Sequence, residues 1–198
     1  MRNWSVKRGG DGPRYASKMD ADEVGLVRSL TTSMIELLDE RESSAPHDEL
    51  AELTGLRTGH PDPPTEGALA RLLPDFYRID QAGHDGVAPE IASDLNAALR
   101  SLNEPEIIDA KRDAARTVLR TLPAKSGGVS LTPAEAADWL TSINDLRLAL
   151  GTMLGITADQ PDGPPSKGPA RAAHVDIYHW LSAMLDVLVS VMLDHTAD

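Results

Sequence analysis

The stretch WLTSINDLRLALGTMLG, residues 139–155, decides the fold class. Its apolar residues recur at intervals of four and three, which is the spacing of one face of an α-helix. They are Trp139, Ile143, Leu146, Leu150 and Met153. The segment TPAE at 132–135 supplies the helix start, with Thr as the N-cap, Pro in the first helical position and Glu closing a capping box. The sequence therefore predicts a long helix that is buried along one face.

Three polar residues interrupt this helix: Asn144, Asp145 and Arg147. Asn144 and Arg147 share a stripe with Gly151, and Asp145 points further round the cylinder. We favour a structural role, in which Arg147 pairs with an acid from another helix and Asn144 satisfies backbone carbonyls, because buried polar groups normally find protein partners. The alternative is an anion- or peptide-binding patch beside the gap at Gly151. The trio forms the candidate binding residues.

The chain ahead of this helix begins with a predicted β-hairpin over residues 3–19, with turn residues in GGDGP. Because an isolated hairpin is marginal in water, we expect Trp4 and Tyr15 to lie against the helices. Asp20 and Glu23 form a capping-box pattern for a helix that should run to about residue 41.

The region 42–77 is rich in loop residues. A short helical turn is expected at 48–53 and a short amphipathic helix at 69–73. Phe76 and Tyr77 then follow, and we expect them to anchor the chain on the core.

Two further helices are predicted on either side of NEPE, residues 103–106. The first buries a stripe of Ile91, Leu95, Ala98 and Leu102. Asn103 would cap the second, with Pro105 tolerated in its first turn and its end near Leu122. The segment KSGGVSL, 125–131, is expected to be a loop with at most a short extended piece.

The last part of the chain is a flexible Pro/Gly loop at 156–170, followed by a final core helix at 171–194. This helix is apolar on two faces, which favours the centre of a bundle or a homodimer interface. The sequence thus predicts a mainly α, single-domain helical bundle of about five helices over residues 1–198, with a small N-terminal β-hairpin at 1–19 and a helical body at 20–155.

The amino-acid composition excludes several classes of function. The chain contains no cysteine, which excludes a disulfide framework, a thiolate metal site and a cysteine nucleophile. No uninterrupted apolar run approaches the roughly 20 residues of a membrane span, and we expect a cytoplasmic protein. Residues 1–18 carry five basic residues and one acid, whereas the remaining 180 carry 14 basic and 30 acidic residues. The acidic body disfavours general nucleic-acid binding, although the basic arm could still contact an anion.

No reaction motif is found. Phosphate-binding glycine loops and the nucleophile elbow are missing, and His174 and His179 are spaced five apart, on different helix faces. The helix after NEPE begins with acids, which suits a solvated face better than a DNA major groove. We therefore predict no catalytic residue, no metal and no cofactor, and we expect that the protein is not an enzyme.

Four segments resemble an actinobacterial family, the domain-of-unknown-function family two-thousand-and-seventeen. They are LARLLPD at 69–75, DAARTVLRTL at 113–122, WLTSINDLRLALGTMLG at 139–155 and IYHWLSAMLDVLV at 177–189. The resemblance implies a regulatory role, since some members are labelled transcriptional regulators. It also implies that the gene for this protein lies beside the gene for the adaptor that delivers N-degron substrates to the Clp protease. No catalytic residues carry over from the family.

The functional expectation is a regulatory or adaptor-like protein-interaction module, linked to regulated proteolysis, with an unidentified protein partner. One alternative is a DNA-binding transcriptional regulator that uses the basic hairpin. The other is a small-ligand or enzyme site around Asn144 and Arg147.

Overall fold

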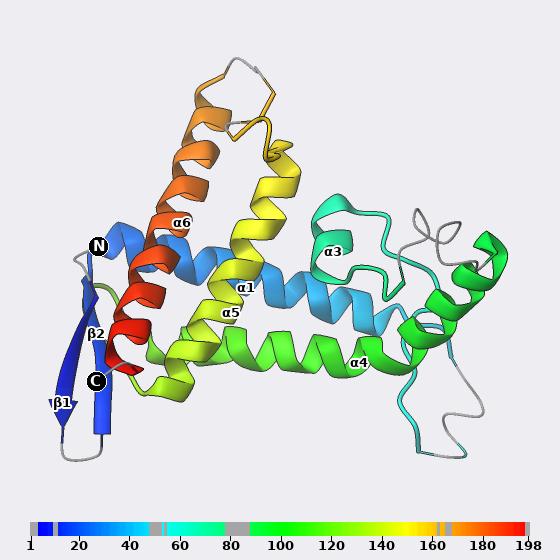
Figure 1. Cartoon of the computed structure of the whole chain (residues 1–198), viewed down its shortest axis with the longest axis horizontal. Coiled ribbons are helices and arrows are strands. Elements are labelled where there is room, and N and C mark those ends of the chain that lie inside the picture. The colour runs from blue at the N-terminus through cyan, green and yellow to red at the C-terminus, as the bar shows by residue number, and fades with distance from the viewer. Residues whose placement is uncertain are drawn as a thin grey trace. The chain divides into compact units, whose positions relative to one another are not determined.

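The chain folds into helices with one small sheet. The computed structural model describes residues 4–9, 12–47, 53, 55–77, 88–161, 163–164 and 168–196. Its elements in chain order are β1 (Ser5–Gly9), β2 (Gly12–Met19), α1 (Ala21–Ser43), α3 (Gly67–Leu72), α4 (Pro89–Thr121), β3 (Gly127–Leu131), α5 (Pro133–Leu154) and α6 (Pro169–Thr196) (Figure 1). The mainly α class is confirmed.

Two compact units make up the chain, and each is described by itself. The first unit comprises Met1–Ile35 with Lys111–Asp198, and the second comprises Glu36–Ala110. The boundaries therefore fall within the sequences of α1 and α4. The single-domain organisation stays a prediction.

The sheet of the first unit is antiparallel, in the order β1-β2-β3. The predicted hairpin is confirmed, with Ser5 opposite Ala16. The segment 125–131 was predicted to be a loop with at most a short extended piece, and the extended piece is strand β3, which pairs with β2 and places Ser130 opposite Ala16. Two consecutive glycines gave this segment the appearance of a loop, and its partner strand lies more than 100 residues earlier in the chain.

One face of the sheet packs on the helices, as expected. Trp4 and Tyr15 are both buried, and the Trp4 ring meets Trp139 of α5 edge-on, with centroids 5.7 Å apart. The indole nitrogen of Trp139 donates a 2.7 Å hydrogen bond to the Thr121 hydroxyl. A fully buried tryptophan with its single donor satisfied anchors this core.

Helix α5 begins and packs largely as its sequence predicts. Thr132 and Glu135 form the reciprocal capping box, and Asp20 and Glu23 do the same for α1. The predicted stripe of α5 fails at its end, since Met153 is 72% exposed and Leu154 is buried instead.

The final helix, α6, packs on α5 and contacts β1 and β2. Its buried residues are Leu181, Met184, Leu185 and Leu188. By length and average hydropathy alone α6 could cross a membrane, a test that core helices also pass. Helix α6 was not singled out from the sequence, because the criterion there was an uninterrupted apolar run. Asp and His residues interrupt the apolar run of α6, but its mean hydropathy remains high.

In the second unit, the predicted restart at NEPE is wrong. Helix α4 is continuous, with Pro105 inside it. A proline lacks the N–H that would bond the carbonyl four residues earlier, here that of Ser101. The Gly59 N–H donates to this carbonyl at 2.7 Å, and the Asn103 side chain bonds the Leu99 carbonyl instead of capping a helix. A loop residue thus replaces the missing helical hydrogen bond.

The predicted buried stripe of this part of α4 is also wrong. Ile91, Leu95 and Leu102 are 61%, 43% and 60% exposed. The residues that are buried instead are Ala92, Asn96, Arg100 and Glu104. They can face inward because distant segments satisfy them, as when the Asn96 amide exchanges two 2.7 Å hydrogen bonds with the Tyr77 backbone.

Two smaller predictions concern the loop region of this unit. The short helix α3 is confirmed, with Leu69, Leu72 and Leu73 buried, but Phe76 is 42% exposed and does not anchor the core. The helical turn expected at 48–53 lies outside the described residues except for Leu53.

Candidate functional site

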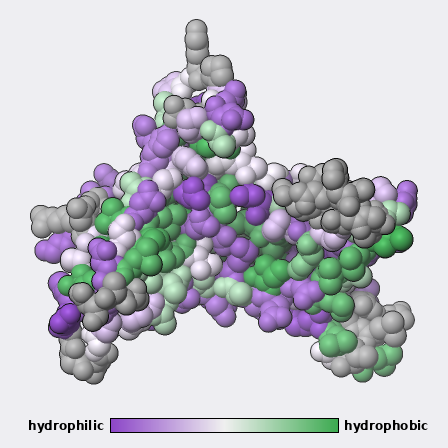
Figure 2. Space-filling model, in the orientation of Figure 1, coloured by the Kyte–Doolittle hydropathy of each residue, from purple (hydrophilic) through white to green (hydrophobic). Residues whose placement is uncertain are grey.

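The candidate site is a groove of about 460 Å³ between α5 and α6, in the first unit. The two helices run antiparallel side by side (Figure 1). Its walls are Leu140, Thr141, Asn144 and Arg147 from α5, and Ser182, Leu185, Asp186 and Val189 from α6. Figure 2 shows apolar surface over this part of the molecule, bordered by polar residues. The groove therefore contains two of the three residues singled out from the sequence.

Arg147 is held in this groove by neutral groups. One terminal nitrogen donates to the Asn144 Oδ1 at 2.9 Å, and the other makes a long 3.4 Å contact with the Tyr178 hydroxyl. The guanidinium carbon lies 5.9 Å from the centroid of the Tyr178 ring, within reach of a cation–π interaction. The acid from another helix that the sequence led us to expect is not among these partners. The charge of Arg147 is positioned but not neutralised within the described part of the chain.

Asn144 works as the positioning group of this pair. A guanidinium only donates, so the amide must turn its oxygen toward Arg147. The predicted role, satisfying backbone carbonyls, is not what the hydrogen bonds show. The amide nitrogen of Asn144 makes no hydrogen bond within the described residues and remains a donor at the groove wall.

Asp145 lies apart from the other two. Both of its carboxylate oxygens accept from the Lys111 Nζ, at 2.8 and 2.9 Å, and the residue is 7% exposed. Burial raises the pKa of Asp145, and the ammonium of Lys111 opposes that rise without cancelling it. Its carboxylate thus joins α5 to α4 and contributes nothing to the groove.

Gly151 permits the close approach of a side chain from α6. A Cβ at this position would lie 3.0 Å from Cε2 of Tyr178. Tyr178, Ser182 and Asp186 were not predicted as site residues, because the pattern of α6 indicates only a core helix. The one usable signal was a glycine inside α5 facing an aromatic-bearing helix.

The chemistry available at this groove is anion recognition. A fixed guanidinium, an amide donor and an apolar wall can receive a carboxylate attached to an apolar group. Among the described residues, no group of three or more His, Asp or Glu side chains is arranged to hold a metal ion.

A second cavity, of about 450 Å³, lies in the second unit and has its polar groups already engaged. Arg57 forms ion pairs with Asp109 and Glu42. The His60 Nε2 lies 3.0 Å from the Arg41 carbonyl and 3.1 Å from the Ser44 hydroxyl. These side chains hold the loop together, so we take the α5–α6 groove as the candidate site.

Comparison with known proteins gives a family and named relatives. A family model described as "Domain of unknown function (DUF2017)" matches residues 1–192. Proteins named "Oxidative stress regulator AosR" from Mycobacterium bovis and Mycobacterium tuberculosis are each 46% identical over 194 residues, covering 98% of this chain and 88% of the relative. No solved structure matches. The chain belongs to the DUF2017 family, as the resemblance of its helical segments led us to expect.

Proposed function

We propose that this protein is a regulator in the response to oxidative stress, acting by contact with another macromolecule and without catalysis. The observation that carries the proposal is the similarity to relatives named as oxidative stress regulators, which spans 98% of the chain. The expected protein partner and adaptor-like mode of action belong to this proposal. The link to regulated proteolysis rests on the family resemblance alone and stays a prediction.

The absence of cysteine shapes how such a regulator would work. Reversible oxidant sensing at a thiol requires a cysteine thiolate, and this chain has none. In the proposal, thiol-based oxidant sensing therefore occurs on a partner, and this chain contributes a binding surface.

Complementation tests the regulatory role. The gene for the relative in Mycobacterium bovis is replaced by one encoding this chain, and survival in hydrogen peroxide is measured. We expect survival to be restored, and a Trp139→Ala variant, which loses the buried anchor of α5, to fail. Normal accumulation of this chain without any recovery of survival would contradict the proposal.

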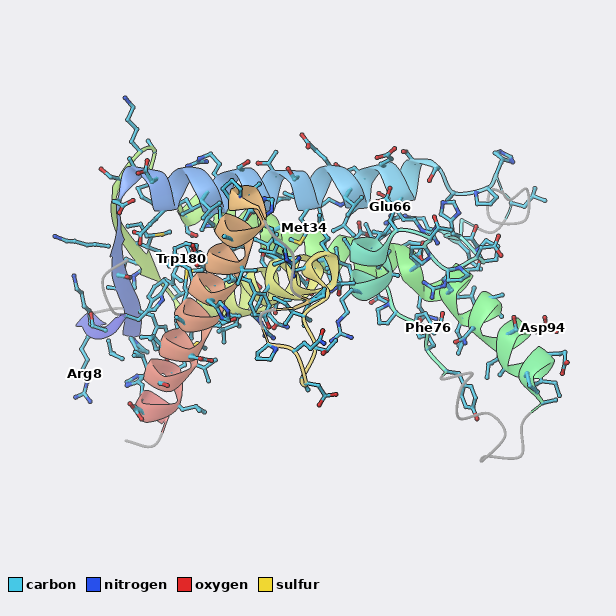
Figure 3. The ribbon with its side chains drawn as sticks, turned by 90° about the horizontal axis from the view of Figure 1, so that it is seen from above. Arg8, Met34, Glu66, Phe76, Asp94 and Trp180 are labelled. Atoms are coloured by element: carbon cyan, nitrogen blue, oxygen red, sulfur yellow. The ribbon has the colours of Figure 1, made fainter. Side chains whose placement is uncertain are left out.

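A second candidate function, nucleic-acid binding, is favoured by the outer face of the sheet. The register places Lys7 directly opposite Arg14, with Lys18 on the same face of β2. None of the three strands contains Asp or Glu, and a shallow hollow of about 300 Å³ lies on this face. Like charges directly opposite one another repel, and phosphates would relieve that repulsion. The side chain of Arg8 projects outward from the hairpin (Figure 3).

Charge reversal tests this second candidate. A gel-shift titration with duplex DNA at low salt compares the chain with an Arg14→Glu/Lys18→Glu variant. An Arg116→Glu/Arg120→Glu variant makes the same charge change at two exposed residues of α4. Binding should be lost only in the sheet variant and should weaken as salt rises, with a log–log slope of about −3 if three phosphates are neutralised. Equal loss in both variants, or no shift at all, would rule this candidate out.

A further inference from the structure

We infer that the α5–α6 groove binds a small aliphatic monocarboxylate. Arg147 and Asn144 receive the carboxylate, and Leu140, Leu185 and Val189 contact the aliphatic part. This inference goes beyond the proposed function, because it assigns a small-molecule ligand to a protein proposed to act through macromolecular contacts.

The first argument is the uncompensated charge of Arg147. A guanidinium has five donor hydrogens in a planar fork that matches a carboxylate. Both groups that it contacts, the Asn144 oxygen and the Tyr178 hydroxyl, are neutral. Its Nε is buried and has no hydrogen-bond partner among the described residues. Because this buried Nε has no accessible surface, a ligand would bind the remaining hydrogens of the two terminal nitrogens, where a carboxylate would compensate the charge.

The second argument is that the receiving group is fixed before any ligand arrives. Asn144 holds one edge of the guanidinium, and the Tyr178 ring lies beside it because Gly151 leaves room for that ring. A group that is already oriented loses less conformational entropy when it binds. The free amide nitrogen of Asn144 adds a donor on the same wall.

The third argument is the apolar remainder of the groove. Leu140 and Leu185 line it from the two helices, and Val189 is 38% exposed there. The volume of about 460 Å³ lies within the range of about 300–1,000 Å³ usual for small-ligand sites. An aliphatic chain placed on this wall removes apolar surface from water.

The fourth argument concerns selectivity. Asp186 is exposed and also lines the groove, and it is the one acidic side chain among the lining residues. A second negative charge on the ligand would be repelled by it. The groove is thus suited to a monoanion with an apolar tail, in preference to a dicarboxylate or a phosphate ester.

The experiment is a titration of the full-length, ¹⁵N-labelled chain with hexanoate, followed by NMR amide shifts. Hexanamide, which has nearly the same shape and no charge, is the matched probe. We expect saturable shifts in α5 and α6 with hexanoate and at least tenfold weaker binding of hexanamide, since hydrogen bonds to charged groups are the stronger ones.

Two substitutions with opposite expected effects make the test specific. Arg147→Gln should weaken hexanoate binding at least tenfold and abolish the preference over hexanamide. Asp186→Asn should strengthen hexanoate binding severalfold, because it removes the like charge. Arg116→Gln, which makes the same charge change as Arg147→Gln at a remote exposed site, should change nothing.

The inference is overturned if hexanoate gives no saturable shift, if hexanamide binds equally well, or if folded Arg147→Gln binds hexanoate normally. Binding of an acetylated, amidated Leu-Glu-Leu peptide without binding of hexanoate would also overturn it, and would make the groove a protein-docking surface. The complementation test does not depend on these outcomes, so the two proposals fail separately.

Discussion

Glu104 shows how a charged residue becomes part of a core at the scale of single side chains. It accepts from Arg41 at 2.8 Å and from Arg100 at 3.1 Å, and the side chains of Glu104 and Arg100 are each 2% exposed. Arg100 also donates to Asp75 and to the Leu73 carbonyl. One acid therefore compensates two arginines contributed by different helices. Removing it leaves both without that partner.

We therefore expect Glu104→Ala to lower the free energy of unfolding by about 3–5 kcal/mol, the usual cost of leaving buried charges unpaired. Urea denaturation followed by far-ultraviolet circular dichroism measures this. Asp113→Ala, which breaks the exposed pair with Arg116, should change stability by no more than about 0.5 kcal/mol. Equal effects of the two substitutions would show that Glu104 is not a structural charge.

The burial of Asp145 predicts how the stability of the fold depends on pH. Because burial raises the pKa of Asp145 in the folded state, the folded state retains this proton to higher pH than the unfolded state does. The contribution of Asp145 to stability is therefore fully present below its ordinary pKa and is lost as pH rises through the raised value.

The measurement is the unfolding free energy across this acidic range for the natural chain and for Asp145→Asn. The natural chain should lose stability relative to the variant as pH rises from the ordinary pKa of an aspartate through the raised pKa of Asp145. A difference that grows in the opposite direction would mean that the Lys111 interaction outweighs burial.

Methionine exposure predicts where peroxide acts on the folded chain. Met153 is 72% exposed, whereas Met19, Met34 and Met184 are 3–4% exposed. Sulfoxide formation requires access of the oxidant to sulfur, so Met153 should be oxidised well before those three. Peptide mapping by mass spectrometry after brief peroxide treatment checks this order. Earlier oxidation of the buried three would contradict the packing described for them.

At the scale of elements, α4 depends on a residue far outside it. The Gly59 N–H donates to the Ser101 carbonyl, which Pro105 cannot bond because it has no N–H. Gly59 also lies so close to α4 that an added Cβ would be 3.1 Å from Pro105 Cδ and 3.2 Å from Glu104 Cβ. The absence of a side chain at Gly59 is therefore a requirement of the packing.

Gly59→Ala should lower the free energy of unfolding by about 1–3 kcal/mol, because it overpacks this contact. Gly25→Ala is the matched control. Gly25 lies in α1, and an added Cβ there meets nothing within 4 Å. That substitution should raise stability by about 0.5–1 kcal/mol through helix propensity alone. Thermal denaturation of both variants tests the pair, and destabilisation by both would refute the packing argument.

At the scale of the whole molecule, the two units provide a test of the predicted single domain. Trp4, Trp139 and Trp180 all belong to the first unit, whereas Gly59 belongs to the second. Tryptophan fluorescence therefore reports on the first unit alone. If the chain unfolds as one cooperative domain, Gly59→Ala should lower the urea midpoint seen by fluorescence as much as the midpoint seen by circular dichroism. A fluorescence midpoint that does not change would show two independently unfolding domains.

The candidate site was only partly predictable. Arg147 and Asn144 stood out because polar residues interrupt an apolar stripe, and both line the groove. Tyr178 and Asp186 did not stand out, since nothing in the pattern of α6 indicates which of its faces meets α5. Asp145 stood out as well, and its ion pair with Lys111 separates it from the groove.

Features that depend on neighbours along the chain could be predicted from the amino-acid sequence. These are the mainly helical class, the hairpin, and the capping boxes at Asp20 and Thr132. Such features follow from hydrogen bonds and periodicities that span only a few residues. Three other features follow from long-range contacts: the buried face of α4, the addition of β3 to the sheet, and the continuation of α4 through Pro105. Each of these depends on a partner brought from a distant part of the chain, because a polar face, an edge strand or an unpaired carbonyl is stable in the interior only when such a partner satisfies it.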